Sequence, residues 1–194
     1  MTTIQERSDR AQHAAAGATE VSPAPARRWL AVTRIALGFV FLWAFVDKTF
    51  GLGYATHAAK SWLNGGSPTS GFLGHVEVGP FRSLFGSLAG YPIVDWLFML
   101  GLLGIGVALI AGIGLRISAV AGTVMLVLMW AAEWPLAKLT FEGQPSGSVN
   151  PIVDYHLIYA LVLIVLAVAD AGRTWGLGKL WASTSLVKRA PWLK

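Results

Sequence analysis

Four long apolar stretches dominate this chain and constrain its fold more than any other feature. They cover roughly residues 29–50, 93–115, 117–136 and 152–169. An α-helix rises about 1.5 Å per residue, so about 20 apolar residues cross a hydrocarbon layer of about 30 Å. The stretches meet or approach that length. The sequence therefore predicts four membrane-spanning helices.

The composition agrees with a membrane protein. The mean hydropathy of the 194 residues is +0.59, and 13% of them are charged, against roughly 25% in soluble domains. The apolar stretches are continuous and lack the alternation of barrel strands, so they favour helices. We expect an all-α, polytopic four-helix membrane bundle in one domain, residues 29–181. A long extracytoplasmic loop joins its first two helices.

The basic residues predict the orientation of this bundle. Ten of them fall on the side of the termini and three or four on the other side, which predicts a multi-pass cell-membrane protein with both termini cytoplasmic. The first set is Arg7, Arg10, Arg27, Arg28, Arg116, Arg173, Lys179, Lys188, Arg189 and Lys194, and the second is Lys60, Arg82 and Lys138, with Lys48 at a span end. This distribution explains the net charge of +5 without nucleic-acid binding.

Both ends of the chain are predicted to lie outside the bundle. Residues 1–28 are rich in Ala, Thr, Ser and Pro, which predicts a disordered cytoplasmic tail. Residues 182–194 are predicted to form a basic cytoplasmic tail.

The sequence also argues against several kinds of cofactor. It has no cysteine, which excludes disulfides and iron–sulfur clusters ligated by this chain. A b-type haem in the membrane would need two axial histidines, and only His156 lies in a predicted span. No haem and no metal site is expected, and phosphate-loop, zinc-protease and dinucleotide motifs are absent.

Ionisable and aromatic residues gather at the predicted outer ends of the spans. The candidate catalytic residues are His156, Asp154, Glu133 and Asp47, and the candidate cofactor-binding residues are Trp43, Lys48, Trp130, Trp134, Tyr155 and Tyr159. A quinone head group has two carbonyl acceptors and takes up protons on reduction, so a histidine beside carboxylates and a phenol suits it. The alternative is an interfacial aromatic belt with ordinary chain-end charges.

Two charged residues at the other end of the spans form a second hypothesis. Charge inside a bilayer is costly and usually faces protein. If the face of span one that carries Arg34 meets the face of span four that carries Asp170, the two lie at similar depth and form a structural ion pair. The alternative is that Arg34 extends its side chain to the cytoplasmic surface.

The chain resembles the DoxX superfamily over about residues 29–181. The resemblance rests on the segments Arg34-Ile-Ala-Leu-Gly38 and Asp47-Lys48, and on Ala171-Gly172-Arg173-Thr174-Trp175-Gly176-Leu177-Gly178. It is nearer to the DoxD-like branch, named after a membrane subunit of thiosulfate:quinone oxidoreductase. The resemblance implies the four-helix fold and the membrane location and, more weakly, a thiosulfate:quinone oxidoreductase activity. Gly178 stands where DoxX proteins have an aspartate.

Two classes of function remain open. The first is a membrane subunit of a quinone-linked oxidoreductase complex, in which a partner protein handles the substrate. The second is a noncatalytic membrane scaffold or anchor. A small transporter fits less well, because inverted repeats with broken helices are missing. The expected partners are the lipid bilayer, a partner subunit and a second copy of the chain. Pairs of small residues on spans two and three predict close helix contacts, either within one chain or, as the alternative, between two copies.

Overall fold

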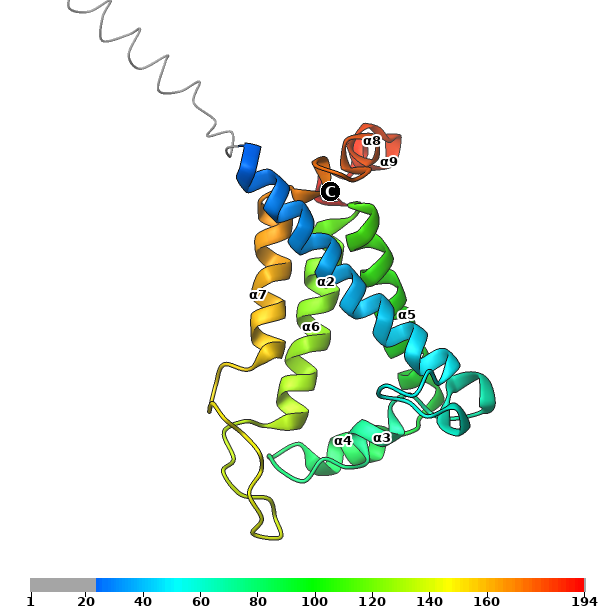
Figure 1. The fold of residues 1–194 in the computed structure, drawn as a ribbon, viewed down its shortest axis with the longest axis vertical. Coiled ribbons are helices and arrows are strands. Elements are labelled where there is room, and N and C mark those ends of the chain that lie inside the picture. The colour runs from blue at the N-terminus through cyan, green and yellow to red at the C-terminus, as the bar shows by residue number, and fades with distance from the viewer. Residues whose placement is uncertain (1–23, 194) are drawn as a thin grey trace, which may run out of the picture.

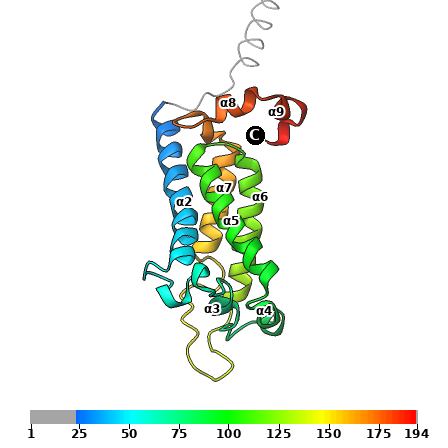
Figure 2. The same cartoon turned by 90° about the vertical axis from the view of Figure 1, so that its right-hand side faces the viewer.

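The protein is all-helical in the computed structural model, which describes residues 24–193 (Figure 1). Four long helices lie side by side, and successive ones run in opposite directions (Figures 1 and 2). They are α2 (Ala24–Phe50), α5 (Pro92–Ala111), α6 (Leu115–Glu133) and α7 (Tyr155–Val168). The start of α2 and the C-terminal helices therefore lie at the same end.

Three of these helices, α2, α5 and α6, are long and apolar enough to cross a membrane. Helix α7 has 14 residues and rises about 21 Å, so it is shorter than the fourth predicted span. All four helices turn large apolar side chains outward, among them Phe39, Leu97, Val120 and Leu161. Such a continuous apolar exterior is compatible with a lipid environment and rare on soluble monomers.

The helices pack in two close pairs, α2 against α5 and α6 against α7, which are joined by contacts between α5 and α6. The core holds Leu37, Phe41, Met99, Leu102 and Leu163, among other buried side chains. The turn between α5 and α6 is confined to residues 112–114. Gly112 and Gly114 adopt positive φ angles of 73° and 57° there, which glycine tolerates without a steric penalty.

The connection from α2 to α5 contains short helical segments and crosses the lower end of the molecule (Figure 1). These are η1 (Ala58–Lys60), η2 (Trp62–Asn64), α3 (Ser70–Leu73) and α4 (Arg82–Leu88). Asp47 and Asp95 fix the connection to the helix ends. Asp47 accepts hydrogen bonds from the Tyr54 and Ala55 amides, and Asp95 accepts hydrogen bonds from the amide and hydroxyl of Thr69.

Helical residues occur inside both predicted tails. Helix α2 begins at Ala24, five residues before the predicted start of the first span, and residues 1–23 lie outside the described part. The C-terminal residues that were predicted as a tail are largely helical. The segments after α7 are η3 (Ala171–Arg173), α8 (Gly178–Ser183), α9 (Ser185–Arg189) and η4 (Pro191–Leu193).

Candidate functional site

The first part of the candidate site is the beginning of α7, which an aspartate organises. Asp154 is the N-cap residue of α7, and its Oδ1 accepts a hydrogen bond from the Leu157 amide at 3.1 Å. Aspartate is favoured there because its side chain satisfies a helix amide that has no partner within the helix. The other carboxylate oxygen, Oδ2, lies 2.8 Å from Nδ1 of His156.

The second part is the end of α6. Glu133 is the last residue of α6, and the next residue, Trp134, ends the helix in a left-handed conformation with φ 41°. Oε1 of Glu133 accepts a hydrogen bond from the Tyr155 hydroxyl at 3.0 Å, and Oε2 lies 3.8 Å from Nδ1 of His156. The structure therefore brings Glu133, Asp154, Tyr155 and His156 together, and we call these four residues the outer cluster.

The side chains of the outer cluster differ in how far they are exposed to solvent. The His156 side chain is 1% exposed, that of Asp154 is 15% exposed and that of Glu133 is 38% exposed. The Tyr155 and His156 rings lie with their centroids 4.0 Å apart. Nε2 of His156 is buried and has no hydrogen-bond partner within residues 24–193. The imidazole therefore lies beneath the carboxylates and makes its polar contact with them.

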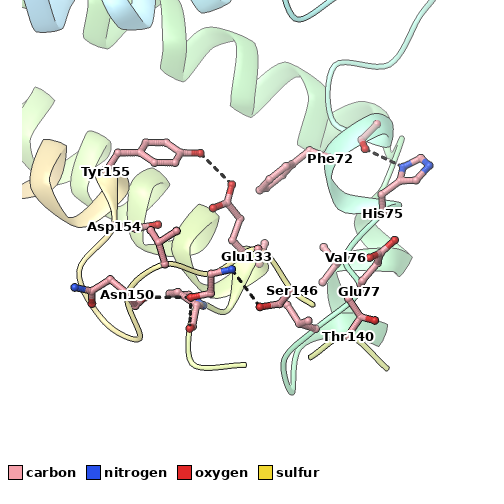
Figure 3. A pocket seen from close by; sticks show the side chains of 17 residues that line it. Phe72, His75, Val76, Glu77, Glu133, Thr140, Ser146, Asn150, Asp154 and Tyr155 are labelled. Atoms are coloured by element: carbon pink, nitrogen blue, oxygen red, sulfur yellow. Dashed lines mark hydrogen bonds between the residues drawn. The ribbon is translucent and has the colours of Figure 1, made fainter. Parts of the chain in front are cut away.

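A pocket of about 400 Å³ opens beside the outer cluster (Figure 3). Glu133, Asp154 and Tyr155 line one side of it, and the rest of the lining comes from Ala132 of α6, from residues 71–78 and from the loop that joins α6 to α7. The remaining lining residues are Gly71, Phe72, His75, Val76, Glu77, Val78, Ala132, Pro135, Thr140, Ser146, Gly147, Ser148, Val149 and Asn150. The pocket is therefore a shared hollow between two connections that lie far apart in the sequence.

Most of this lining is not among the residues predicted from the sequence. The loop after Glu133 has no predicted role, although residues 140–150 hold hydroxyl, amide and glycine residues shortly before Asp154. That composition is a usable signal, because loops that follow a rigid helix commonly carry binding residues.

The pocket is acidic. Three carboxylates, those of Glu77, Glu133 and Asp154, belong to its lining, while the lining contains no lysine or arginine. A site with one sign of charge concentrates ligands of the opposite sign. The pocket therefore favours cations and disfavours small oxyanions.

The structure does not bring the candidates of α2 into this cluster. Asp47 is buried against the connection that follows α2, Lys48 Nζ lies 6.0 Å from the centroid of the Phe98 ring, and Trp43 packs on Phe39 and Tyr54. None of these three predicted residues lines the pocket. The prediction used membrane depth alone, but α2 pairs with α5 while α7 pairs with α6, so equal depth does not bring their ends together.

The predicted aromatic residues of α6 and α7 support the site from outside the pocket. Trp130 Nε1 donates a hydrogen bond to the Ile152 carbonyl at 2.8 Å and so ties the end of the loop to α6. Trp134 packs on Phe81 and Trp130. Tyr159 lies edge-on to Tyr155, with the ring centroids 6.0 Å apart. Of the six predicted cofactor-binding residues, Tyr155 alone is in the pocket lining.

The predicted ion pair of Arg34 and Asp170 is wrong. Arg34 donates hydrogen bonds to backbone carbonyls, namely those of Leu109, Ile110, Thr174 and Trp175. Asp170 instead pairs with Arg173 at 3.3 Å, and both side chains are more than half exposed. The physical reason is that α7 ends at Val168 and Asp170 has a φ angle of 49°, so helical spacing does not place it.

Comparisons of the chain with protein families, with curated proteins and with solved structures each found no match.

Proposed function

We propose that the chain is a four-pass membrane subunit of a quinone-linked oxidoreductase complex, and that the outer cluster binds the quinone head group at the pocket. The observation that carries the proposal is the outer cluster itself: a phenol, two carboxylates and a buried imidazole in hydrogen-bond contact beside a pocket of about 400 Å³. The resemblance of residues 29–181 to the DoxX superfamily supports the same class of function.

The chemistry assigns a role to each group. Reduction of a quinone to a quinol needs two electrons and two protons. In this proposal the Tyr155 hydroxyl turns its single proton from Glu133 Oε1 to a quinone carbonyl, while Asp154 and His156 form a hydrogen-bonded pair that can pass a proton. In this proposal a partner subunit supplies the two electrons. The chain itself has no cysteine with which to ligate an iron–sulfur cluster.

The test of this proposal is the variant His156→Ala. We expect quinone-dependent turnover of the complex to fall at least a hundredfold. General acid–base catalysis by one side chain typically contributes a factor of about 10² to 10⁴ to the rate. The matched control is His57→Ala, an exposed histidine on the connection from α2 to α5. Turnover is measured as quinol formation in proteoliposomes, and the folded state is checked by size-exclusion chromatography.

The anchoring alternative makes the opposite prediction. If His156→Ala turns over like the wild type, and affinity purification recovers a stoichiometric partner with both proteins, the outer cluster has no redox role and the chain serves as a scaffold.

The proposal includes four membrane passes with both termini in the cytoplasm. Because the chain has no cysteine, single cysteines can report the side of the membrane without a background. The two substitutions are Ser83→Cys in α4 and Ser185→Cys in α9, both at exposed positions. In intact cells, a membrane-impermeant maleimide is expected to label Ser83→Cys at least ten times more than Ser185→Cys. Equal labelling, or the reverse preference, would refute this topology.

A further inference from the structure

We infer that Glu133, Asp154 and His156 form a binding site for a divalent transition-metal ion such as Zn²⁺. This inference does not rest on the proposed quinone chemistry, because metal binding is measured without turnover. A bound ion would occupy Nδ1 of His156 and Oδ2 of Asp154, the two atoms of the proposed proton-passing pair, so the two roles are alternatives at these atoms. It goes against the expectation from the sequence, which contains no metal-ligand motif.

The distances fit a shared ion. One ligand atom of each of the three residues lies within 4.8 Å of the others. Nδ1 of His156 is 2.8 Å from Asp154 Oδ2 and 3.8 Å from Glu133 Oε2. Ligand atoms at about 2.0–2.2 Å from one ion lie roughly 3–4 Å apart, so small side-chain shifts suffice to accommodate an ion.

Each carboxylate presents one oxygen to the site and keeps the other on a protein donor. Asp154 Oδ1 is held by the Leu157 amide and Glu133 Oε1 by the Tyr155 hydroxyl, which leaves Oδ2 and Oε2 facing His156. Such partners outside the ligand shell orient the ligands of protein metal sites. The three side chains are therefore already arranged as single-atom ligands.

The charge balance is the independent observation that points to a cation. Within residues 24–193, the only ion-pair partner of Glu133 and Asp154 is His156, which is charged only when protonated. A third carboxylate, that of Glu77, lines the same pocket, and the lining holds no lysine or arginine.

The low exposure of two of the three ligands, Asp154 and His156, supports the same conclusion. A carboxylate that is 15% exposed beside an imidazole that is 1% exposed lacks the hydration of a surface acid. A divalent cation would compensate both carboxylates directly.

The mixture of ligands indicates the kind of ion. An imidazole nitrogen with two carboxylate oxygens suits first-row transition ions, Zn²⁺ among them, whereas Mg²⁺ and Ca²⁺ prefer oxygen ligands alone. With three protein ligands, the remaining coordination positions of the ion stay open to water or a substrate from the pocket.

The experiment uses the full chain in detergent, stripped with a chelator and then titrated with Zn²⁺ alone. We expect one Zn²⁺ per chain by elemental analysis and a rise in the unfolding temperature on binding. Glu133→Gln, Asp154→Asn and His156→Gln should each weaken Zn²⁺ binding at least tenfold. Asp154→Asn is chosen because asparagine still caps α7. The matched control, Glu77→Gln, removes a pocket carboxylate outside the three ligands and should weaken binding less than threefold.

Two results would overturn the inference: a wild-type protein that binds less than one Zn²⁺ per chain, or ligand variants that bind it as tightly as Glu77→Gln does. The quinone content of the same samples separates the two proposals. If the ligand variants lose Zn²⁺ binding but retain quinone, the quinone role of these three residues is refuted and the metal site is supported. Retained Zn²⁺ binding in a protein that holds no quinone would support the metal site alone.

Discussion

Replacing Arg34 with methionine is expected to lower the unfolding temperature of the protein in detergent by about 6–12 °C. The guanidinium is fully buried and donates to four carbonyls, two at the end of α5 and two at Thr174 and Trp175. Methionine fills a similar volume but leaves these acceptors unpaired. Buried acceptors without partners cost about 1–3 kcal/mol each, so even partial rehydration leaves a loss of about 3 kcal/mol. For a chain of this size, each kcal/mol of lost stability lowers the unfolding temperature by about 2–4 °C, which gives the expected decrease.

The site of Arg34 explains why it needs no carboxylate. The last carbonyls of α5 carry the partial negative charge of a helix C-terminus, and a buried cation there is favourable. The surrounding glycines leave the space for the guanidinium. A Cβ atom on Gly112 would lie 2.9 Å from Nη1 of Arg34, and one on Gly176 would lie 3.0 Å from Nη2. Arg34 therefore joins α2 to α5 and to the segment after α7.

Two further variants separate this role from a general effect of charge. Arg34→Lys keeps the charge but offers three donors from one nitrogen, so we expect it to recover less than half of the lost stability. Arg116→Met removes an exposed arginine whose one hydrogen bond, to the Pro191 carbonyl, is 3.5 Å long, and it should shift the unfolding temperature by less than 2 °C. Equal unfolding temperatures of Arg34→Met and Arg116→Met would contradict the proposed role.

The helices themselves could be predicted because hydrophobic runs determine them without reference to the rest of the chain. The runs at residues 29–50, 93–115 and 117–136 match α2, α5 and α6 within a few residues. The fourth run begins three residues before α7 and ends one residue after it. Hydropathy does not detect the start of the helix, because Asp154 caps it after the apolar run has begun. The end of the run lies within one residue of the end of α7, and Asp170 follows in a turn with a positive φ angle.

The outer cluster could be predicted in part for a similar reason. Glu133 and Asp154 end and begin consecutive antiparallel helices, so their proximity follows from the chain order. The placement of Asp47 does not follow from it, because the pairing of α2 with α5 depends on side-chain packing between helices. Arg34 likewise binds backbone carbonyls rather than Asp170 because of how the folded backbone is arranged. The pattern of charged residues in the sequence contains no information on where those carbonyls lie.

A second large effect is expected from Gly106→Ala, which adds one methyl group where α5 lies close to the backbone of α2. A Cβ atom on Gly106 would lie 2.7 Å from the Leu42 amide nitrogen and 3.0 Å from its Cα atom. These are backbone atoms that no side-chain rotation can move, so the two helices must separate. Overpacking of this kind costs about 1–3 kcal/mol, and we expect the upper half of that range because the contact is rigid. Close approach of backbones is the usual basis of helix packing inside membranes.

The matched control for this variant is Gly104→Ala, two residues earlier in α5. A Cβ atom on Gly104 meets nothing within 4 Å, and both glycines lie inside the same helix. Alanine raises helix propensity by about 0.8–1.0 kcal/mol in water, so Gly104→Ala should leave the unfolding temperature unchanged or raise it. The two variants make the same chemical change in the same helix, and only the neighbouring backbone differs. If Gly106→Ala unfolds at the same temperature as Gly104→Ala, α2 and α5 are not in close contact at this point.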